Sequence, residues 1–468
     1  MARPITDEEK RYARELLTKA RAAMKAVEDY DQETVDRLCQ AVGWATANEK
    51  TFTRVAQMGV DESGIGDRAG RVAKRFKIMG ILRDALRHKS MGIIEEDAVK
   101  GLVKYGKPAG VIAALVPTTN PELTPPGVGI YALKCKDAVI FSPHPRSKNT
   151  TMEMVKVMRE TLKRNGAPED LYQCVEKPSI PLSQELMSIC DLTIATGGMA
   201  MVRAAYSSGK PSYGVGAGNS TMVIDETADV AEAALNTRLS KTSDFGSGCS
   251  ADGNLLVEAS IYDAFLQQLQ AEGGYLASDE EKARLEAVMW DAAGNRNVDT
   301  VARSAQEMAA AAGFTIPVDR RFIIVKEDSI GKEHRFSGEK LTTVLAIFKY
   351  SGFDNVLEMV RRIYEVGGKG HSCGIYSFDD DHIHRLALVA PVSRIMVRQP
   401  QSKANAGSFT NGMPMTSSLG CGIWGGNITN ENIHLKHYMN TTLVAKPIPE
   451  DRPSEEELFG EFYNTETL

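Results

Sequence analysis

The strongest constraint on the fold is a change of rhythm at residue 109, where short β-prone runs begin to alternate with helical stretches. Strands separated by helices predict βαβ units, and therefore an α/β fold with a doubly wound parallel sheet. Such a sheet binds ligands beyond the carboxyl ends of its strands. The β-prone runs are residues 111–116, 138–142, 172–175 and 192–195, and helical patterns cover 125–135, 150–165 and 182–189.

The residues before this sheet predict helices and a hairpin. Thr6 and Glu9 have the spacing of a capping box, and apolar residues then recur at helical spacing. Further helical patterns cover residues 33–60 and 67–87, and residues 91–107 contain two short strand-like pieces. The apolar stripes of these helices are most simply a packing surface.

The composition is that of an ordinary globular protein. The residues are 43% hydrophobic and 25% charged. A chain of 468 residues is longer than one hydrophobic core usually holds, so we expect two or more domains. The net charge is -6 and the basic residues are scattered, which argues against a nucleic-acid partner. The N-terminus has no secretory h-region and no apolar run reaches membrane-spanning length, so we expect a cytoplasmic protein without a membrane partner.

The cysteines point to a reducing compartment and to one special residue. An odd, widely spaced set without a C-x-x-C pair suits neither a disulfide framework nor a zinc site. Cys249 stands among small residues in S-K-T-S-D-F-G-S-G-C-S-A-D-G-N (240–254), between an expected helix at 230–238 and an apolar run at 255–258. It is either a reachable nucleophile or a small hydrophobe. The full set is Cys39, Cys135, Cys174, Cys190, Cys249, Cys373 and Cys421.

Three of the predicted strands are followed by informative residues. P-T-T-N-P follows the first strand at 117–121, S-P-H-P-R-S-K follows the second at 142–148, and T-G-G follows the fourth at 196–198. Glycines at a strand-to-helix turn let a phosphate approach backbone N–H groups, although a plain tight turn has the same sequence. No G-x-G-x-x-G follows the first strand, so the standard dinucleotide fingerprint is absent.

Seven motifs occur in a fixed order between about residues 109 and 446. They are P-T-T-N-P, F-S-P-H-P-R-S-K, A-T-G-G-M-A-M-V-R-A-A-Y-S-S-G-K-P, G-V-G-A-G-N-S, the Cys249 segment, G-G-K-G-H-S and L-G-C-G-I-W-G-G-N. Together they resemble the CoA-acylating branch of the aldehyde dehydrogenase superfamily, which includes acetaldehyde, succinate semialdehyde and sulfoacetaldehyde dehydrogenases. The resemblance implies a cofactor domain and a catalytic domain joined by a crevice, with a small strand extension for oligomerisation.

The resemblance also divides the chain. It implies a cofactor-binding domain at 1–225, a catalytic domain at 226–430 and a final segment at 431–468 that returns to the first domain. The stretch T-T-L-V-A-K at 441–446 is β-prone and could add to a partner's sheet edge or form an ordinary edge strand. A homodimer or homotetramer is expected.

The resemblance makes Cys249 the nucleophile of an aldehyde oxidation. Its thiolate adds to the carbonyl, a hydride passes to the nicotinamide, and a thioester remains on the enzyme. Asn120 corresponds to the family's side-chain donor for the oxyanion, beside the backbone N–H of Cys249, although an asparagine before Pro121 could simply shape a turn. His371 would assist the second half of the reaction, or be structural.

One departure from the hydrolytic members of the superfamily indicates the reaction type. Where those enzymes carry a glutamate general base in E-L-G-G, residues 215–218 read V-G-A-G. Without that carboxylate, water near the thioester has no activator, so the acyl group is expected to pass to coenzyme A. A hydrolytic dehydrogenase and a catalytically silent relative remain alternatives.

The resemblance assigns specific roles to only some of the expected cofactor residues. Gly197 and Gly198 would lie beside the pyrophosphate, and Glu339 would hold the nicotinamide ribose or be a surface charge. Basic residues follow the second strand with no Asp or Glu nearby, which favours NADP, with NAD possible. The full predicted set is Thr118, His144, Arg146, Lys148, Thr196, Gly197, Gly198 and Glu339.

The aldehyde pocket is implied to lie between the Cys249 segment and the loop at 405–412. Its polar residues are Ser247, Ser250, Ser408, Thr410 and Asn411, and the cations considered to be within range are Lys241, Arg394, Arg398 and Lys403. Many donors suit a short aldehyde with an anionic tail, such as sulfoacetaldehyde or succinate semialdehyde. Acetaldehyde or another alkyl aldehyde would prefer an apolar pocket, and the polar groups could instead satisfy loop backbone.

The tract D-D-D-H-I-H-R resembles a metal site only superficially. We expect a solvated turn in which His382 and His384 are exposed, and no step of the reaction requires a metal.

Overall fold

The computed structural model describes residues 3–463, whose first body is built on a five-stranded parallel sheet in the order β5-β4-β3-β6-β7. Its strands are β3 (Val111–Val116), β4 (Ala138–Pro143), β5 (Tyr172–Cys174), β6 (Leu192–Thr196) and β7 (Ser212–Val215). Every residue of β3 and β4 is buried, as expected where helices cover both faces. The chain runs outward from β3 to β5 and then returns to the other side of β3, which confirms the doubly wound prediction.

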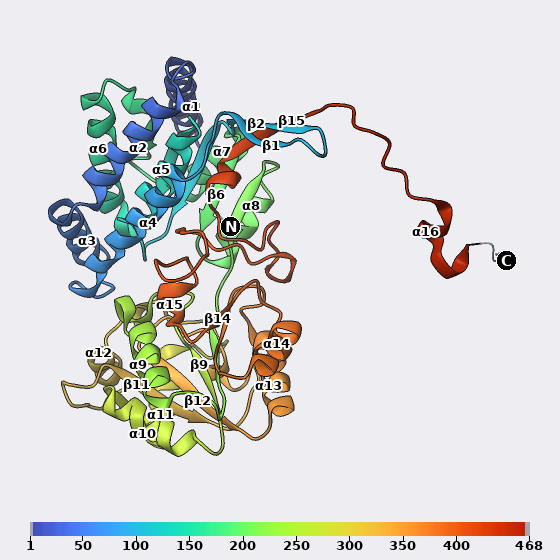
Figure 1. Cartoon of the computed structure of the whole chain (residues 1–468). Coiled ribbons are helices and arrows are strands. Elements are labelled where there is room, and N and C mark those ends of the chain that lie inside the picture. The colour runs from blue at the N-terminus through green and yellow to red at the C-terminus, as the bar shows by residue number, and fades with distance from the viewer. Residues whose placement is uncertain (1–2, 464–468) are drawn as a thin grey trace.

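Eight helices of the described chain pack against this sheet and beside it (Figure 1). The predicted capping box is confirmed, because the Glu9 N–H donates to Thr6 Oγ1 at 3.2 Å and the Thr6 N–H donates to Glu9 Oε2 at 3.0 Å. The helical patterns expected at 33–60 are confirmed as two helices, which are separated at Asn48 because its side chain accepts the N–H of Thr51 and caps the second helix. The helices are α1 (Asp7–Ala26), α2 (Gln32–Ala47), α3 (Glu49–Ser63), α4 (Arg75–Leu86), α5 (Thr124–Lys134), α6 (Lys148–Arg164), α7 (Ile180–Ile189) and α8 (Met199–Tyr206), with the 3₁₀ turn η1 (Gly70–Lys74) before α4.

The second body contains a seven-stranded parallel sheet in the order β10-β11-β12-β9-β8-β13-β14. Its strands are β8 (Thr221–Ile224), β9 (Asn254–Glu258), β10 (Gly274–Leu276), β11 (Phe322–Glu327), β12 (Val344–Tyr350), β13 (Cys373–Tyr376) and β14 (Ile395–Val397). Leu255 and Val257 face one apolar cluster and Leu256 faces another, which follows the two-residue period of a strand. The chain changes sheets between Val215 and Thr221, before the predicted boundary at 226.

Helices lie on both faces of this second sheet (Figure 1). They are α9 (Val230–Lys241), α10 (Tyr262–Ala271), α11 (Asp279–Met289), α12 (Ala305–Ala311), α13 (Phe353–Val366), α14 (Asp380–Val389) and α15 (Gln401–Ala404). The histidine tract is therefore helical and not a solvated turn. His384 is exposed, but the prediction is wrong for His382, because its Nδ1 lies 2.8 Å from Asp225 Oδ2 and its ring stacks on Phe353.

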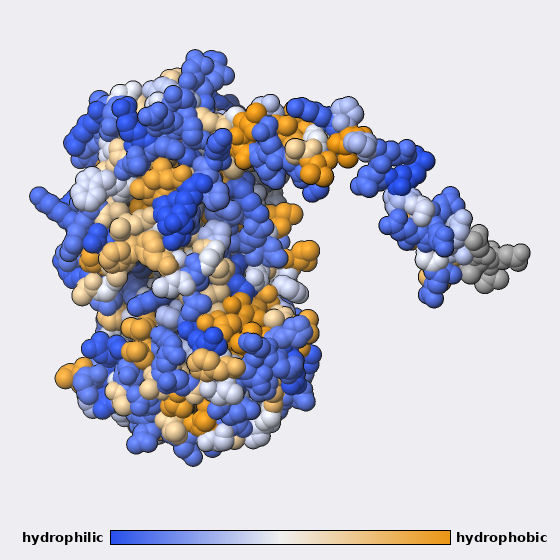
Figure 2. Space-filling model, in the orientation of Figure 1, coloured by the Kyte–Doolittle hydropathy of each residue, from blue (hydrophilic) through white to orange (hydrophobic). Residues whose placement is uncertain are grey.

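A small antiparallel sheet projects from the body, followed by the C-terminal helix α16 (Glu455–Phe459) (Figure 1). The predicted hairpin is confirmed as β1 (Gly92–Asp97) and β2 (Leu102–Pro108), and the predicted late strand forms β15 (Met439–Ala445) on β2 of the same chain. Its exposed apolar residues include Leu443 and Val444, and Figure 2 shows apolar surface on this projection. Its role in assembly stays a prediction. None of the helices between residues 3 and 463 could cross a bilayer.

Candidate active site

A crevice of about 1250 Å³ lies where the strand ends of the first sheet meet the second body. Parallel strands place their carboxyl ends on one edge, so residues from distant motifs converge there. The order of the strands reverses between β3 and β6, and both strand ends contribute to the lining. The lining includes Thr118, Asn120, His144, Thr196, Gly197, Gly198, Cys249 and Glu339.

A strained loop holds Cys249 at the crevice. Asp244 and Phe245 have φ values of 47° and 52°, a left-handed conformation that costs a non-glycine residue about 1–3 kcal/mol. Contacts of the Asp244 carboxylate offset this strain. Its Oδ1 accepts the N–H of Asp67 at 2.8 Å, and its Oδ2 accepts the hydroxyl of Ser247 at 2.9 Å.

The thiol of Cys249 lies against His371, with 3.0 Å between Sγ and Nε2. The other ring nitrogen, Nδ1, lies 2.8 Å from Ser372 Oγ, and that hydroxyl lies 3.0 Å from Ser220 Oγ. Ser220 in turn donates to the carbonyl oxygen of Cys249 at 3.4 Å. If each hydroxyl donates onward around this circuit, Nδ1 carries the imidazole proton and Nε2 can accept the thiol proton. The resemblance assigned His371 to the second half of the reaction, but this contact also places its ring against the thiol of Cys249.

Burial keeps the resting Cys249–His371 pair neutral. It raises the pKa of the Cys249 thiol to about 12, and the Glu339 carboxylate adds to the rise. It lowers the pKa of His371 to about 3, and the nearby Arg394 guanidinium acts in the same direction. Both shifts favour a thiol beside a neutral imidazole over a thiolate beside an imidazolium.

Gly218 packs directly against the backbone of Cys249. A Cβ built on Gly218 would lie 1.9 Å from the carbonyl oxygen of Cys249. Its N–H donates to Glu339 Oε1 at 2.9 Å, and burial raises the pKa of Glu339 to about 7. Residues 215–217 line the crevice beside Gly218, so this part of the wall bears no carboxylate.

The predicted cofactor residues divide into two groups. Thr118, His144, Thr196, Gly197, Gly198 and Glu339 line the crevice, whereas Arg146 and Lys148 are not part of its lining. Arg146 Nη2 donates to the carbonyl oxygen of Ser63 at 3.0 Å, and Lys148 begins α6. The two cations that favoured NADP are therefore not part of the lining, because Arg146 contacts the end of α3 and Lys148 is the first residue of α6.

The start of α8 fits a pyrophosphate. The helix begins directly after Gly198, and among the described residues no side chain caps it. A Cβ on Gly198 would meet no atom within 4 Å, so the approach to the first N–H groups is open. The positive end of a helix with free N–H groups suits a phosphate, and the crevice fits a dinucleotide in this respect.

Only some of the residues predicted to bind the aldehyde line the crevice. Ser247, Ser250 and Ser408 line the crevice, whereas Thr410 and Asn411 do not. Asn411 Oδ1 accepts the N–H of Ser408 at 3.1 Å, and its Nδ2 donates to Gln399 Oε1 at 3.0 Å. The Asn411 amide is used within the protein, by the loop and by Gln399, and a role of Thr410 or Asn411 toward the aldehyde stays a prediction.

Of the four cations considered for an anionic tail, Lys403 alone lines the crevice. Lys241 and Arg394 are buried, and Arg394 donates to the carbonyl oxygen of His371. Two lysines that sequence reasoning missed, Lys74 and Lys77, also line it. The one signal for them was a pair of lysines three residues apart in the region predicted to be helical.

Comparison with known proteins agrees with this geometry. Residues 4–413 match the model of the aldehyde dehydrogenase family. The chain belongs to the aldehyde dehydrogenase family. It is 44% identical over 451 residues to a sulfoacetaldehyde dehydrogenase from Acholeplasma sp, which covers 95% of this chain and 93% of that protein.

Two further relatives place the chain beside acylating enzymes of the family. It is 36% identical over 450 residues to the succinate-semialdehyde dehydrogenase (acetylating) of Clostridium kluyveri, covering 96% of this chain and 98% of that one. The solved structure of an acetylating aldehyde dehydrogenase from Geobacillus thermoglucosidasius superimposes with a TM-score of 0.91 at 33% identity, covering 96% and 99% of the two chains. The resemblance and the fold that the motifs predicted are thus confirmed.

Gly218→Ala is expected to lower kcat by about tenfold or more, because the new Cβ would displace the Cys249 backbone. Overpacking of this kind costs about 1–3 kcal/mol, so the variant should fold with a lower Tm. Gly253→Ala is the control, because its Cβ would lie at an ordinary 3.4 Å from the Ser220 carbonyl. Thermal melts and steady-state rates measure both effects. Unchanged kcat in Gly218→Ala would contradict the close packing.

Alkylation of Cys249 by iodoacetamide, without cofactor or aldehyde, should rise with pH and show no plateau below about pH 9, because burial raises the pKa of its thiol. The rate is followed by mass spectrometry of the Cys249 peptide, which separates it from the other six cysteines. A plateau already reached near neutral pH would reveal a thiolate–imidazolium pair and contradict the neutral pair.

Proposed function

We propose that this chain oxidises a short aldehyde to its acyl-CoA thioester with NAD(P)+, through a thioester on Cys249. The observation that carries the proposal is the contact of Cys249 with His371, in a crevice whose wall at 215–217 offers no general base. The relatives named as acetylating dehydrogenases support transfer to coenzyme A.

In the first half of the reaction, the sulfur of Cys249 attacks the carbonyl carbon while its proton passes to His371 Nε2. The oxyanion that forms is stabilised by the amide of Asn120 and the backbone N–H of Cys249. A nicotinamide cofactor held by Gly197, Gly198 and Glu339 would supply the acceptor for the hydride that leaves this carbon. The carbonyl then re-forms as a thioester, and His371 releases its proton to solvent.

In the second half, the thiol of coenzyme A attacks the thioester while His371 takes its proton. The bond between Cys249 Sγ and the acyl carbon breaks, and the sulfur recovers the proton from His371. The sum is aldehyde, CoA and NAD(P)+ giving acyl-CoA, NAD(P)H and one proton. Water competes poorly because residues 215–217 offer it no base.

Hydrolytic release of a free acid is the second candidate. Glu339 favours it, because its carboxyl lies in the crevice and has a pKa of about 7, close to that of a general base. The contact with the Gly218 N–H occupies one of its oxygens, which supports a positioning role instead.

Reduced cofactor should form about tenfold faster, or more, with CoA than without it, because CoA is the better acceptor of the acyl group. Cys249→Ala should abolish this rate and leave the melting temperature nearly unchanged, because little packing is lost. The products are identified by mass spectrometry. Free acid formed at the same rate with or without CoA would establish the hydrolytic alternative.

For the cofactor we keep the prediction of NADP. It is supported by His144 at the crevice beyond β4, where residues 142–148 contain no acidic side chain. Arg146 would reach a 2′-phosphate only by leaving the Ser63 carbonyl. Running the CoA assay with each cofactor measures the preference, and equal or better kcat/KM with NAD would overturn it. The homodimer or homotetramer and the cytoplasmic location also stay predictions.

For the substrate we propose a short aldehyde with an anionic tail, of the kind of sulfoacetaldehyde or succinate semialdehyde. Lys77 supports this, because its Nζ donates to the carbonyl oxygens of Ala406 and Gly407 at 3.2 and 2.9 Å and keeps a third N–H for another acceptor. It lines the crevice beside the late loop. Burial lowers the pKa of Lys77 to about 8, so its ammonium is charged at neutral pH.

Lys77→Met should lower kcat/KM for sulfoacetaldehyde by about tenfold or more, roughly 1.4 kcal/mol of discrimination, while acetaldehyde changes much less. Lys403→Met, which removes an exposed cation, should have the smaller effect. The two variants and the parent are compared on sulfoacetaldehyde, succinate semialdehyde, acetaldehyde and butyraldehyde. A parent enzyme that prefers the uncharged aldehydes by tenfold would sink the anionic-tail proposal.

A further inference from the structure

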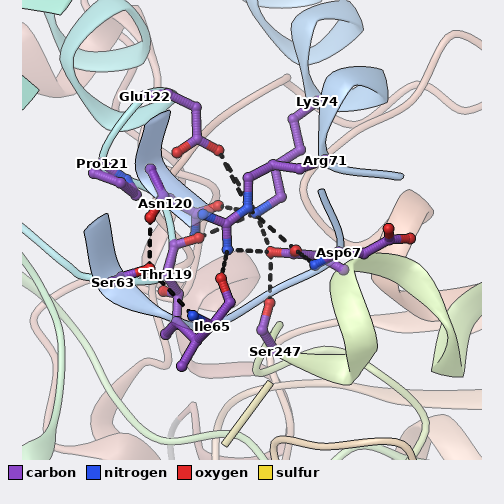
Figure 3. Close-up of polar contacts among 12 residues, drawn as sticks. Ser63, Ile65, Asp67, Arg71, Lys74, Thr119, Asn120, Pro121, Glu122 and Ser247 are labelled. Carbon is purple, nitrogen blue, oxygen red and sulfur yellow. Dashed lines mark hydrogen bonds and ion pairs between the residues drawn. The ribbon is translucent and has the colours of Figure 1, made fainter. Parts of the chain in front are cut away.

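A buried cluster of charges lies beside Asn120 and apart from the Cys249–His371 pair. Figure 3 shows Arg71 and Lys74 of η1 converging with Glu122, which follows Asn120 in the chain. Asp244 of the cysteine loop completes the cluster, with its Oδ2 3.1 Å from Arg71 Nη2 and 2.7 Å from Lys74 Nζ. Arg71, Glu122 and Asp244 are buried, whereas Lys74 is part-buried and lines the crevice. Two cations thus face two carboxylates from different parts of the chain.

All three N–H groups of the Lys74 ammonium have acceptors around this cluster. Its Nζ donates to Asn120 Oδ1 at 2.7 Å, to the Thr119 carbonyl oxygen at 3.1 Å and to Asp244 Oδ2 at 2.7 Å. A lysine ammonium has three donors and no acceptor, so no N–H is left for a substrate. Lys74 therefore differs from Lys77, although both line the same crevice.

The contact with Lys74 decides which way the Asn120 amide faces. Only the amide oxygen can accept from an ammonium, so the amide nitrogen must point away from Lys74. Within the described residues Asn120 Nδ2 makes no hydrogen bond, and Asn120 lines the crevice. A cation on the oxygen side also polarises the amide and strengthens its N–H as a donor.

We propose that Lys74 is a positioning residue for the oxyanion donor, and that Asp244 couples this donor to the nucleophile. The proposal rests on the proposed function, because it takes Asn120 as the donor. The same Asp244 oxygen that holds Lys74 accepts the hydroxyl of Ser247, two residues before Cys249. Donor and nucleophile come from different bodies of the molecule, and one carboxylate sets the distance between them.

A double-mutant cycle tests the proposal. Lys74→Met should lower kcat by about 100-fold, the size expected for loss of an oxyanion donor, with the KM for the cofactor changed by less than about threefold. In an Asn120→Ala background, the same change should cost less than about threefold, because a residue that acts through Asn120 has nothing left to position. A loss of the same size in both backgrounds would assign Lys74 a purely structural role and overturn the proposal.

Two further variants serve as an intermediate case and as a control. Lys74→Gln retains an N–H donor without the charge, so it should fall between the parent and Lys74→Met, and the cycle is run with it in parallel in case Lys74→Met folds poorly. Arg75→Met is the matched control, because it removes the neighbouring cation, whose partner Glu49 is exposed. It should stay within about twofold of the parent.

Failure of this proposal is distinguishable from failure of the proposed function. The effect of CoA and the loss of activity in Cys249→Ala test the acylating reaction without reference to Lys74. If the enzyme instead releases free acid, the cycle still decides the role of Lys74, because both reactions pass through the same oxyanion.

Discussion

The Asp244 carboxylate is the contact on which the site depends. It accepts hydrogen bonds from the Asp67 N–H, from Arg71 and Lys74, and from the Ser247 hydroxyl. Burial alone would raise its pKa, but Lys74 and Arg71 hold that pKa well below its usual range, so the carboxylate stays charged. A charged, fully bonded carboxylate can hold the left-handed backbone at Asp244, and with it the loop that presents Cys249.

This anchor also explains how two different sheets make one site. The first sheet supplies strand ends and the start of α8, which suit an anionic cofactor. The second supplies Cys249, His371 and Glu339. Neither set is sufficient alone, and the charged cluster crosses the crevice between them, so the geometry of the reaction depends on how the two bodies pack.

The environment of Cys249 suits a reaction in which the thiol and the imidazole are neutral at rest and charge develops only as the reaction proceeds. Burial keeps the resting thiol and imidazole neutral, which spares the protein an uncompensated ion pair. The same low polarity strengthens any donor directed at the oxyanion. When the hydroxyls of Ser372 and Ser220 donate onward to the Cys249 carbonyl, His371 Nδ1 carries the ring proton and Nε2 can receive the thiol proton as the carbon–sulfur bond forms.

The sequence by itself determined the repeating architecture and the family to which the chain belongs. Strand and helix periods are local, and the ordered motifs carried Cys249 and Asn120 into one crevice, with His371 against Cys249, because parallel strands share an edge. Tertiary structure alone decided which polar side chains face that crevice. Arg146 turns to Ser63, Asn411 to Gln399 and His382 to Asp225. Lys74 and Lys77, by contrast, enter from η1 and α4, which lie outside every motif. The physical reason is that a polar side chain takes whichever partner the packed backbone brings within about 3 Å, and sequence spacing does not specify that partner.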